Sequence, residues 1–390
     1  MKIVILDITS RNAVQYNPAL CKALSAIIEK GEVTLVAPKL HGVAIGYNYK
    51  RLLTIVPDKW AGGEGRIKRV VRAIEVVLNY IFVFFYLIFK RPDVLHIQWL
   101  PFVEFMGGEK YYLMMLKKFI PKLDIFYTAH NIYPHKLKSD RKSAYAHRFV
   151  SLDKYIDGYI VHLISAKKEL SDEFGIPLSK IFVAYHGIYV AENYTPKESS
   201  NSEGVKRIIM YGFQNKYKGA DILIDAIGML PEEYKKKVSV KIVGLATDKD
   251  LYLICHKKAK ALNIEWINDF VSDEMLYEAI GNSDLILLPY RKISQSGVLL
   301  LALSFRKPIL TSNLPSFIET LEGYPSDYFF KSDDPLSLSK MLERFVDGKI
   351  DVEMQMSIIE KLNKKYSWVE TAKSTFYAYN NVFQGWRRSS

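Results

Sequence analysis

Two short polar turns in this 390-residue chain have residue types that suit the binding of phosphate. The first is Ser294-Gln295-Ser296-Gly297, which follows a strand-like run and precedes the aliphatic segment 298–303. A small polar residue caps a helix that begins after it, and the free N–H groups and dipole of the first turn attract an anion. Gly297 allows a phosphate to approach the backbone closely, and Arg291 adds positive charge upstream. An ordinary capped helix without a ligand is the alternative.

The second turn is the Lys-Gly step at Lys218 and Gly219, within YGFQNKYKGADILIDA (211–226). Here a strand, a polar loop with Gln214 and Lys216, and a helix follow one another. Both turns come after strands, and the carboxyl ends of parallel strands meet at one edge of a sheet. A solvated lysine on a loop is the alternative, but two such helix starts together favour one anion site.

The segments that must position these turns alternate between short apolar strands and helices. Such alternation predicts parallel sheets that helices cover on both faces, which is the doubly wound α/β class. The expected strands lie at 2–8, 33–38, 93–99, 124–130, 158–163 and 181–187, and, after a polar stretch, at 207–212, 238–244, 264–269, 284–290, 307–312 and 327–331.

The chain is long enough for two domains. The polar segment 191–206 predicts a linker, so we expect one domain at 1–190 and another at 207–366. The aromatic segment 367–390 predicts a last helix that crosses back onto the first domain.

The formal net charge of +12 is compatible with nucleic acid, anionic lipid or a polyanionic small ligand as partner. Arginine-rich blocks are absent from the sequence, so we expect no nucleic acid. Cys21 and Cys255 are far apart and form no CxxC spacing, which favours a reducing compartment. The opening residues MKIVILDI predict a strand and not a secretory signal, so we expect a cytoplasmic protein.

One apolar segment, 70–93, raises the question of a membrane. Its uninterrupted part, 80–89, is shorter than the roughly 20 residues that a spanning helix needs. It is expected either as a helix buried against a sheet or as a helix lying in one leaflet, and the two can coexist on different faces. The basic residues that would assist the second are Arg66, Lys68, Arg69, Arg72 and Lys90.

The second half of the chain resembles the nucleotide-sugar-binding domain of GT-B glycosyltransferases, near the GT4-type group (glycosyl transferases group 1). The similar stretches are MYGFQNKYKGADILIDAI, INDFVSDEMLYEAIGNSDLILLPY, QSGVLLLALSFRKPILTSNLPSFIE and YSWVETA. The first half resembles the acceptor domain of that fold, with PDVLHIQW, YTAHNIYPH and VAYHGI in order. The resemblance implies two Rossmann-like domains that face a central cleft. It also implies transfer of a sugar from a nucleoside-diphosphate sugar, which is a substrate, with no cofactor.

The resemblance assigns residues one position at a time. Lys218 matches the lysine that holds the donor diphosphate, and His130 matches a histidine that contacts the donor sugar near the reacting carbon. The expected base-binding loop includes Asp269, Phe270, Val271 and Glu274, and the other expected donor-side residues are Lys216, Gln214, Ser294, Gln295, Ser296 and Gly297. The usual Gly-Arg upstream is Gly212-Phe213 here.

The main departure is a missing glutamate pair. Retaining members carry E-x7-E across the turn, and the matching positions are near Ile293 and Leu301. Diphosphate contacts are then expected from backbone N–H groups and hydroxyls, and both retention and inversion stay open. Inversion needs a base on the acceptor side. The candidates are Glu104, Glu109, His130 and His135, and the expected acceptor-side residues are Asn12, Trp99, Asn131 and His135.

The acceptor is expected to be a lipid-linked glycan in surface or exopolysaccharide assembly, because the first domain is basic and aromatic. Partners are then the nucleotide sugar, the glycan and an anionic membrane surface. No Asp-x-Asp motif stands in a suitable strand-end loop, so no metal is expected. The alternatives are a non-catalytic GT-B binding or scaffold protein and another GT-B enzyme such as an epimerase.

Overall fold

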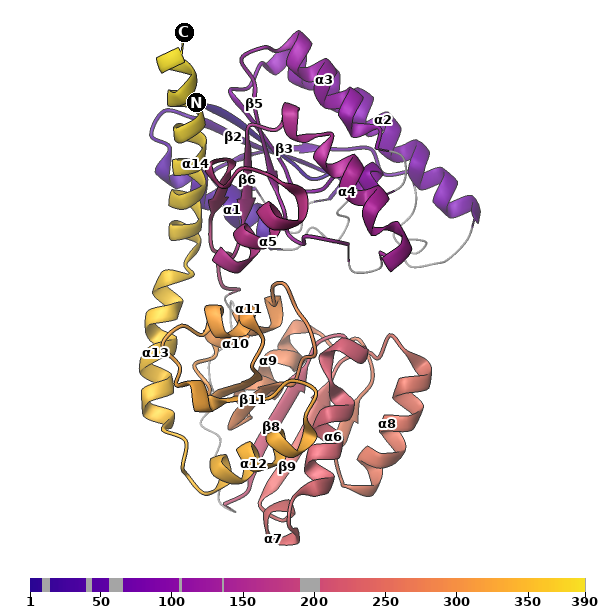
Figure 1. Ribbon diagram of the computed structural model, residues 1–390, viewed down its shortest axis with the longest axis vertical. Coiled ribbons are helices and arrows are strands. Elements are labelled where there is room, and N and C mark those ends of the chain that lie inside the picture. Colours follow the sequence, from indigo (N-terminus) through magenta and orange to yellow (C-terminus); the bar gives the residue numbers. More distant parts are fainter. Residues whose placement is uncertain are drawn as a thin grey trace. The chain divides into compact units, whose positions relative to one another are not determined.

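The computed structural model describes residues 1–8, 15–39, 44–55, 66–104, 107–134, 137–189 and 204–389, without the side chains of 66–69, 104 and 383–389. It divides the chain into two compact units (Figure 1). Unit 1 comprises Met1–Gly187 and Ser367–Ser390, and unit 2 comprises Ile188–Tyr366. Most of the predicted linker 191–206 lies outside the described residues.

Unit 1 contains a seven-stranded sheet in which every strand pair is parallel, with the order β3-β2-β1-β4-β5-β6-β7. The central strands are buried on both faces, which explains why they are continuous apolar runs. The strands are β1 (Lys2–Leu6), β2 (Glu32–Ala37), β3 (Asn48–Arg51), β4 (Val94–Ile97), β5 (Asp124–Thr128), β6 (Gly158–Val161) and β7 (Ile181–Val183).

Helices cover both faces of this sheet, as the α/β class requires. One core cluster joins the sheet to α2, α3, α4 and α5, and another joins it to α1 and α14 (Figure 1). The helices are α1 (Tyr16–Ile27), α2 (Arg66–Lys90), α3 (Glu109–Phe119), α4 (Lys142–Val150), α5 (Ile164–Phe174) and α14 (Trp368–Ser389).

The last helix, α14, is part of unit 1 although it follows unit 2 in sequence. It packs along α1. Its Tyr379 hydroxyl lies 2.6 Å from Nδ1 of the buried His96, and Thr371 donates a hydrogen bond to the carbonyl of Tyr185 at 2.7 Å. The predicted return of the C-terminal helix to the first domain is therefore found.

Unit 2 repeats the architecture with a six-stranded parallel sheet of order β10-β9-β8-β11-β12-β13. Its strands are β8 (Lys206–Tyr211), β9 (Val238–Val243), β10 (Glu265–Ile267), β11 (Leu285–Leu288), β12 (Ile309–Ser312) and β13 (Phe329–Phe330). Its helices are α6 (Ala220–Met229), α7 (Glu232–Lys235), α8 (Lys249–Ala261), α9 (Asp273–Gly281), α10 (Gly297–Ser304), α11 (Pro315–Thr320), α12 (Pro335–Val346) and α13 (Val352–Lys365).

Helix α2 has an unusual distribution of polar and apolar residues. Asn79 is buried and exchanges hydrogen bonds with the backbone of Leu53 at 2.9 and 3.0 Å, while buried Glu75 accepts from the N–H of Ile55 at 2.6 Å. From Val70 to Phe89 the exposed side chains are instead apolar, except that of Arg72. Within the described residues, Val70–Lys90 is long and apolar enough to cross a membrane, and only 28% of its most apolar window is buried. This segment of 21 residues is longer than the uninterrupted apolar run 80–89, because it also includes Glu75 and Asn79.

Candidate functional site

The two predicted turns of unit 2 meet beside Gly212, the first residue after β8. Gly212 has φ +92°, and a Cβ there would lie 3.0 Å from Nζ of Lys218 and 3.2 Å from a methyl group of Val298 in α10. The Lys-Gly turn and the start of α10 are thus brought to one place at the carboxyl edge of the sheet. Gly219 must be glycine, because its φ is +75° and a Cβ would lie 2.0 Å from the carbonyl oxygen of Pro289.

Lys218 places a buried positive charge at this point. Lys218 is only 6% exposed, and burial lowers the pKa of its ammonium group to about 8. Among the described residues its ammonium group forms no hydrogen bond or ion pair, and it lies 5.0 Å from the ring centroid of Tyr290. A buried charge is costly unless it is paired, so this geometry suits an anion that is bound from outside.

The start of α10 supplies backbone donors to the same place. Ser296 is the N-cap, and its hydroxyl accepts from the N–H of Leu299 at 3.1 Å. The Tyr211 hydroxyl donates to the carbonyl of Val298 at 2.8 Å and fixes α10 to the end of β8. Gly297 is exposed, while Ser294 and Gln295 are half-buried in the turn before it. The remaining first-turn N–H groups and the helix dipole favour a phosphate.

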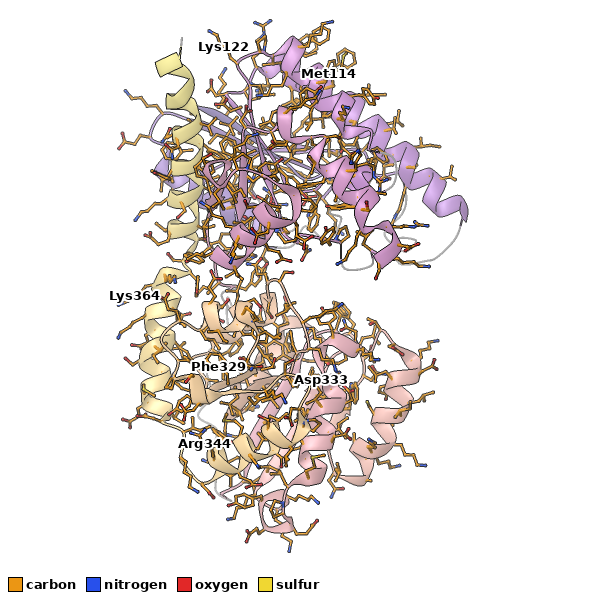
Figure 2. All side chains as sticks on the ribbon, viewed as in Figure 1. Met114, Lys122, Phe329, Asp333, Arg344 and Lys364 are labelled. Carbon is orange, nitrogen blue, oxygen red and sulfur yellow. The ribbon has the colours of Figure 1, made fainter. Side chains whose placement is uncertain are left out.

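Arg291 was expected to add positive charge for the phosphate, but its charge is already paired with carboxylates. Its guanidinium forms two hydrogen bonds of 2.8 Å to the carboxylate of Asp221 and one of 2.7 Å to Asp333, which Figure 2 labels. It also donates to the carbonyl of Lys216 at 2.8 Å. Arg291 therefore holds the Lys-Gly loop in place through charges that are already paired.

The other predicted donor-side residues have distinct positions in that loop. The side chain of Lys216 is exposed, whereas Gln214 is buried and donates from Nε2 to the carbonyl of Gly212 at 2.7 Å. Gln214 thus shapes the turn around Gly212.

The predicted base-binding loop follows β10 and ends at the Ser272 N-cap of α9. Asp269, Val271 and Glu274 lie at the surface or half-buried, and Phe270 is 76% exposed. The Phe270 ring centroid is 6.4 Å from that of Phe213, which occupies the position where the resemblance leads one to expect arginine. Two exposed aromatic rings at a carboxyl edge can stack on a nucleobase.

In unit 1 the carboxyl edge holds a row of polar groups, with one residue just after each of four neighbouring strands. Gln98 follows β4, His130 follows β5, His162 follows β6 and Ala184 follows β7. His130 Nε2 lies 2.9 Å from the Gln98 amide, His130 Nδ1 lies 3.3 Å from His162 Nε2, and His162 Nδ1 lies 2.8 Å from the Ala184 carbonyl oxygen. We call these four residues the histidine row.

Burial keeps the histidines of this edge neutral. It lowers the pKa of His162 to about 4 and holds that of His130 well below its usual range, and neighbouring histidines lower the pKa of His130 further. His186, which follows β7, has a pKa of about 3 for the same reasons. The imidazoles therefore act as neutral hydrogen-bonding groups.

Aromatic rings enclose His130. The Trp99 ring stacks on it with centroids 4.9 Å apart and planes at 19°, and the Tyr16 ring meets it edge-on at 5.1 Å. Trp99 is 38% exposed, and Asn131 is half-buried beside it in sequence. These are the two predicted acceptor-side residues that the structure describes.

Other predicted residues of this side fall elsewhere. Asn12 and His135 lie outside the described residues, as does the side chain of Glu104. Glu109 is only 1% exposed and accepts a hydrogen bond from the N–H of Phe102, which lies in the 3-10 helix Pro101–Glu104. Glu109 therefore faces the interior, and burial raises its pKa to about 7. In the described part of the chain, no group of three or more His, Cys, Asp or Glu side chains is arranged to hold a metal ion.

The predictions from sequence missed Gln98 and His162. A signal for both exists, because each is a polar residue directly after a buried strand, like His130. What the sequence alone did not give is the spatial order β4-β5-β6-β7, which makes them neighbours.

The architecture of both units is that of the GT-B fold. HepE from Anabaena, solved with UDP and glucose, has a TM-score of 0.69 at 14% identity, with 98% of this chain and 100% of that chain covered. Sucrose-phosphate synthase from Thermosynechococcus elongatus has a TM-score of 0.72 at 13% identity, with 99% and 100% covered. At these identities the likeness concerns the fold.

The sequence of unit 2 is similar to a known family. Residues 193–365 match the family model of glycosyl transferases group 1. A GDP-mannose:glycolipid 4-beta-D-mannosyltransferase of Xanthomonas campestris pv. campestris is 26% identical over 232 residues, which are 57% of this chain. The match spans 61% of the length of that relative. The family model that matches unit 2 is the one that the resemblance implied.

Proposed function

We propose that this protein is a glycosyltransferase that moves a sugar from a nucleoside-diphosphate sugar to a lipid-linked glycan in the assembly of a surface or exported polysaccharide. The observation that carries the proposal is the buried ammonium of Lys218, which has no anionic partner in the described residues and lies next to the start of α10. A diphosphate supplies the missing charge and accepts the first-turn N–H groups of that helix.

Two features suggest which donor to test first. The Xanthomonas relatives are named for GDP-mannose and a glycolipid acceptor. The neighbour from Anabaena was solved with UDP. The exposed pair Phe213 and Phe270 offers a stacking surface to either base. We propose a guanine nucleotide as the leading donor and a uracil nucleotide as the competitor.

The proposed reaction breaks the bond between the anomeric carbon and the diphosphate oxygen, and an acceptor hydroxyl oxygen bonds to that carbon. Negative charge grows on the leaving diphosphate in the transition state. Preorganised hydrogen-bond donors stabilise this transition state more than they stabilise the bound nucleotide sugar. We assign this stabilisation to Lys218 and to the first-turn N–H groups of α10, which lie together beside Gly212. The hydroxyl proton leaves either to the diphosphate or to a base, and the anomeric configuration of the product distinguishes retention from inversion. No metal and no cofactor is part of this proposal.

A membrane surface is the proposed location of the acceptor, because unit 1 exposes many apolar side chains on α2 and α3. The helices pack together through Phe84, whose ring is 5.7 Å from that of Phe119. Helix α2 packs Val83 and Leu87 into the core and is apolar on its exposed face as well, unlike a surface helix of a water-soluble protein. The exposed side chains are Val70, Ile74, Val77, Leu78, Ile81, Phe82, Phe85 and Phe89 on α2, and Tyr111, Met114, Met115 and Phe119 on α3.

Lysines flank this apolar face. Lys118 and Lys122 lie at the end of α3 and are exposed, and Lys90 ends α2 (Figure 2 labels Lys122 and Met114). Apolar insertion together with basic residues is the combination that binds an interfacial helix to anionic lipid. We propose the inner face of the cell membrane as the location of the protein.

Donor turnover tests the proposal against a non-catalytic scaffold. The full chain is incubated with GDP-mannose or UDP-glucose and vesicles that contain a lipid-linked glycan fraction, and release of the nucleotide is measured. We expect release from one donor that depends on the glycolipid. Binding of the nucleotide without release from any donor would favour the scaffold. A sugar product that stays on the nucleotide would favour an epimerase.

A further inference from the structure

Gln98, His130, His162 and the Ala184 carbonyl form a chain of hydrogen bonds whose donors and acceptors can be assigned. A carbonyl oxygen only accepts, so His162 must carry its proton on Nδ1, 2.8 Å from the oxygen of Ala184. Neutral His162 then has a lone pair on Nε2 and can only accept there. The partner at that nitrogen is His130 Nδ1, at 3.3 Å, which therefore donates.

The same reasoning assigns the hydrogen-bond donor and acceptor between His130 and Gln98. Neutral His130 with a proton on Nδ1 has a lone pair on Nε2, which needs a donor. The amide of Gln98 lies 2.9 Å away and is fully buried. When the amide oxygen faces His130, the NH₂ group has no partner among the described residues. Turning the amide by 180° gives Nε2 of His130 a donor and gives the NH₂ group an acceptor, and such amide orientations are assigned from the network. The amide oxygen then takes the position that has no partner among the described residues.

Two competing assignments keep all three hydrogen bonds, and they make either His162 or His130 a cation. In both, His130 donates from Nε2 to the Gln98 oxygen. Both leave the Gln98 NH₂ group without a partner in the described residues and place a charge among the rings of His130, His162 and His186. A buried, unpaired cation is the costlier state.

We infer that His162 is a positioning residue that holds His130 in the Nδ1–H tautomer, so that Nε2 of His130 is a hydrogen-bond acceptor. The direction of the row is set at its base by a backbone carbonyl, which no side-chain rearrangement can reverse. A sugar hydroxyl that displaces the Gln98 amide can then bind His130 only by donating. This last step rests on the proposed function, whereas the tautomer does not.

Nitrogen NMR of the free protein tests the tautomer directly. Histidine is labelled with ¹⁵N, and two-bond ¹H–¹⁵N correlations distinguish the two neutral tautomers and the cation. The His130→Gln variant identifies the His130 signals by their loss. We expect a protonated Nδ1 and an unprotonated Nε2 at neutral pH. A His130 that is protonated at Nε2, or at both nitrogens, would overturn the inference.

Variants separate positioning from packing. In His162→Leu the acceptor is gone, and we expect His130 to lose the pure Nδ1–H form. In His162→Gln the amide oxygen can accept from His130, so we expect the tautomer to be retained. His96→Gln is the matched control, because His96 is as buried but bonds to Tyr379 and Thr128 instead. An unchanged His130 spectrum in His162→Leu would contradict the assigned role.

Activity gives an independent readout. Once a donor and acceptor are known, we expect kcat/KM to fall roughly tenfold or more in His162→Leu, the effect of losing one oriented hydrogen bond, and to recover in His162→Gln. If the wild-type protein transfers no sugar, the proposed function fails, and the NMR result still decides the tautomer. If transfer is found and both variants retain it equally, His162 has no positioning role.

Discussion

An ammonium group that is buried without an anion destabilises a protein, and Lys218, at the carboxyl edge of unit 2, has no anionic partner among the residues that the structure describes. Burial, and not a neighbouring charge, is the cause of its low pKa of about 8. Strain of this kind persists where a ligand completes the site. The free protein therefore retains an unfavourable feature that the proposed nucleotide would relieve.

Replacement of Lys218 by methionine keeps the length of the side chain and removes the charge. The pKa of Lys218 drops from 10.5 to about 8, so we expect the free Lys218→Met protein to be more stable by about 1–3 kcal/mol. Chemical denaturation of the two free proteins measures this difference. A clear loss of stability in Lys218→Met would show that the ammonium is paired in the free protein.

The same pKa predicts how nucleotide binding depends on pH. Lys218 is protonated below about pH 8 in the free protein, and a bound diphosphate raises its pKa. Binding therefore takes up a proton above pH 8, and the affinity falls as pH rises, by up to about tenfold per pH unit. Calorimetric titrations between pH 7 and 9.5 measure this dependence, and the residual binding of Lys218→Met should lack it. An affinity that is constant over this range would contradict the role of Lys218.

Helix α2 exposes large apolar side chains, which are unfavourable in water unless another surface covers them. Its inner face uses Asn79 and Glu75 to satisfy the backbone of residues 53–55, and its outer face exposes phenylalanines such as Phe85 and Phe89. Such an arrangement is unfavourable in water and favourable at the boundary of headgroups and acyl chains.

Glutamates at this face should abolish membrane binding. We expect Phe85→Glu/Phe89→Glu to lose binding to vesicles of anionic lipid in a sedimentation assay, because two charges must then enter the acyl region. The matched control is Leu253→Glu/Ile254→Glu on α8 of unit 2, where both residues are 64–66% exposed. Loss of binding in the control, or full binding by the α2 variant at low salt, would refute the membrane face.

The elements that the sequence predicts best are those with continuous apolar runs. Buried strands such as β5 and β11 appear where they are expected, since both faces of a parallel sheet are covered. Strand β3 was not predicted, because its residues Asn48–Arg51 are polar and mostly exposed at the sheet edge. An edge strand of four residues has no apolar pattern to detect.

The turns of unit 2 were predictable because each is local. Ser296 as an N-cap and Lys218 before Gly219 can be inferred from a few neighbouring residues, and the structure places both turns beside Gly212. The histidine row was not predictable in this way. Its successive members are 32, 32 and 22 residues apart in sequence, and only the order of β4 to β7 in the sheet makes them partners.

At the scale of the whole molecule, each unit gathers its polar groups at the carboxyl edge of a parallel sheet. Unit 2 offers a charge and helix N–H groups, which suit a diphosphate, and unit 1 offers neutral imidazoles and an aromatic ring, which suit a sugar. Transfer between a nucleotide sugar and a second substrate needs both kinds of surface. This division of chemistry between two units is what the proposed glycosyltransferase requires.

A thermal-shift series of the full chain with UDP, GDP, ADP, TDP and CMP tests the central claim most directly. A ligand at 100 times its dissociation constant adds about 2.7 kcal/mol, which is a rise in Tm of roughly 5–10 °C for units of this size. We predict such a rise with one nucleoside diphosphate in the wild type, with GDP as the leading candidate, and its loss in Lys218→Met. No rise with any nucleotide, or an equal rise in the variant, would contradict a diphosphate site at Lys218 and α10.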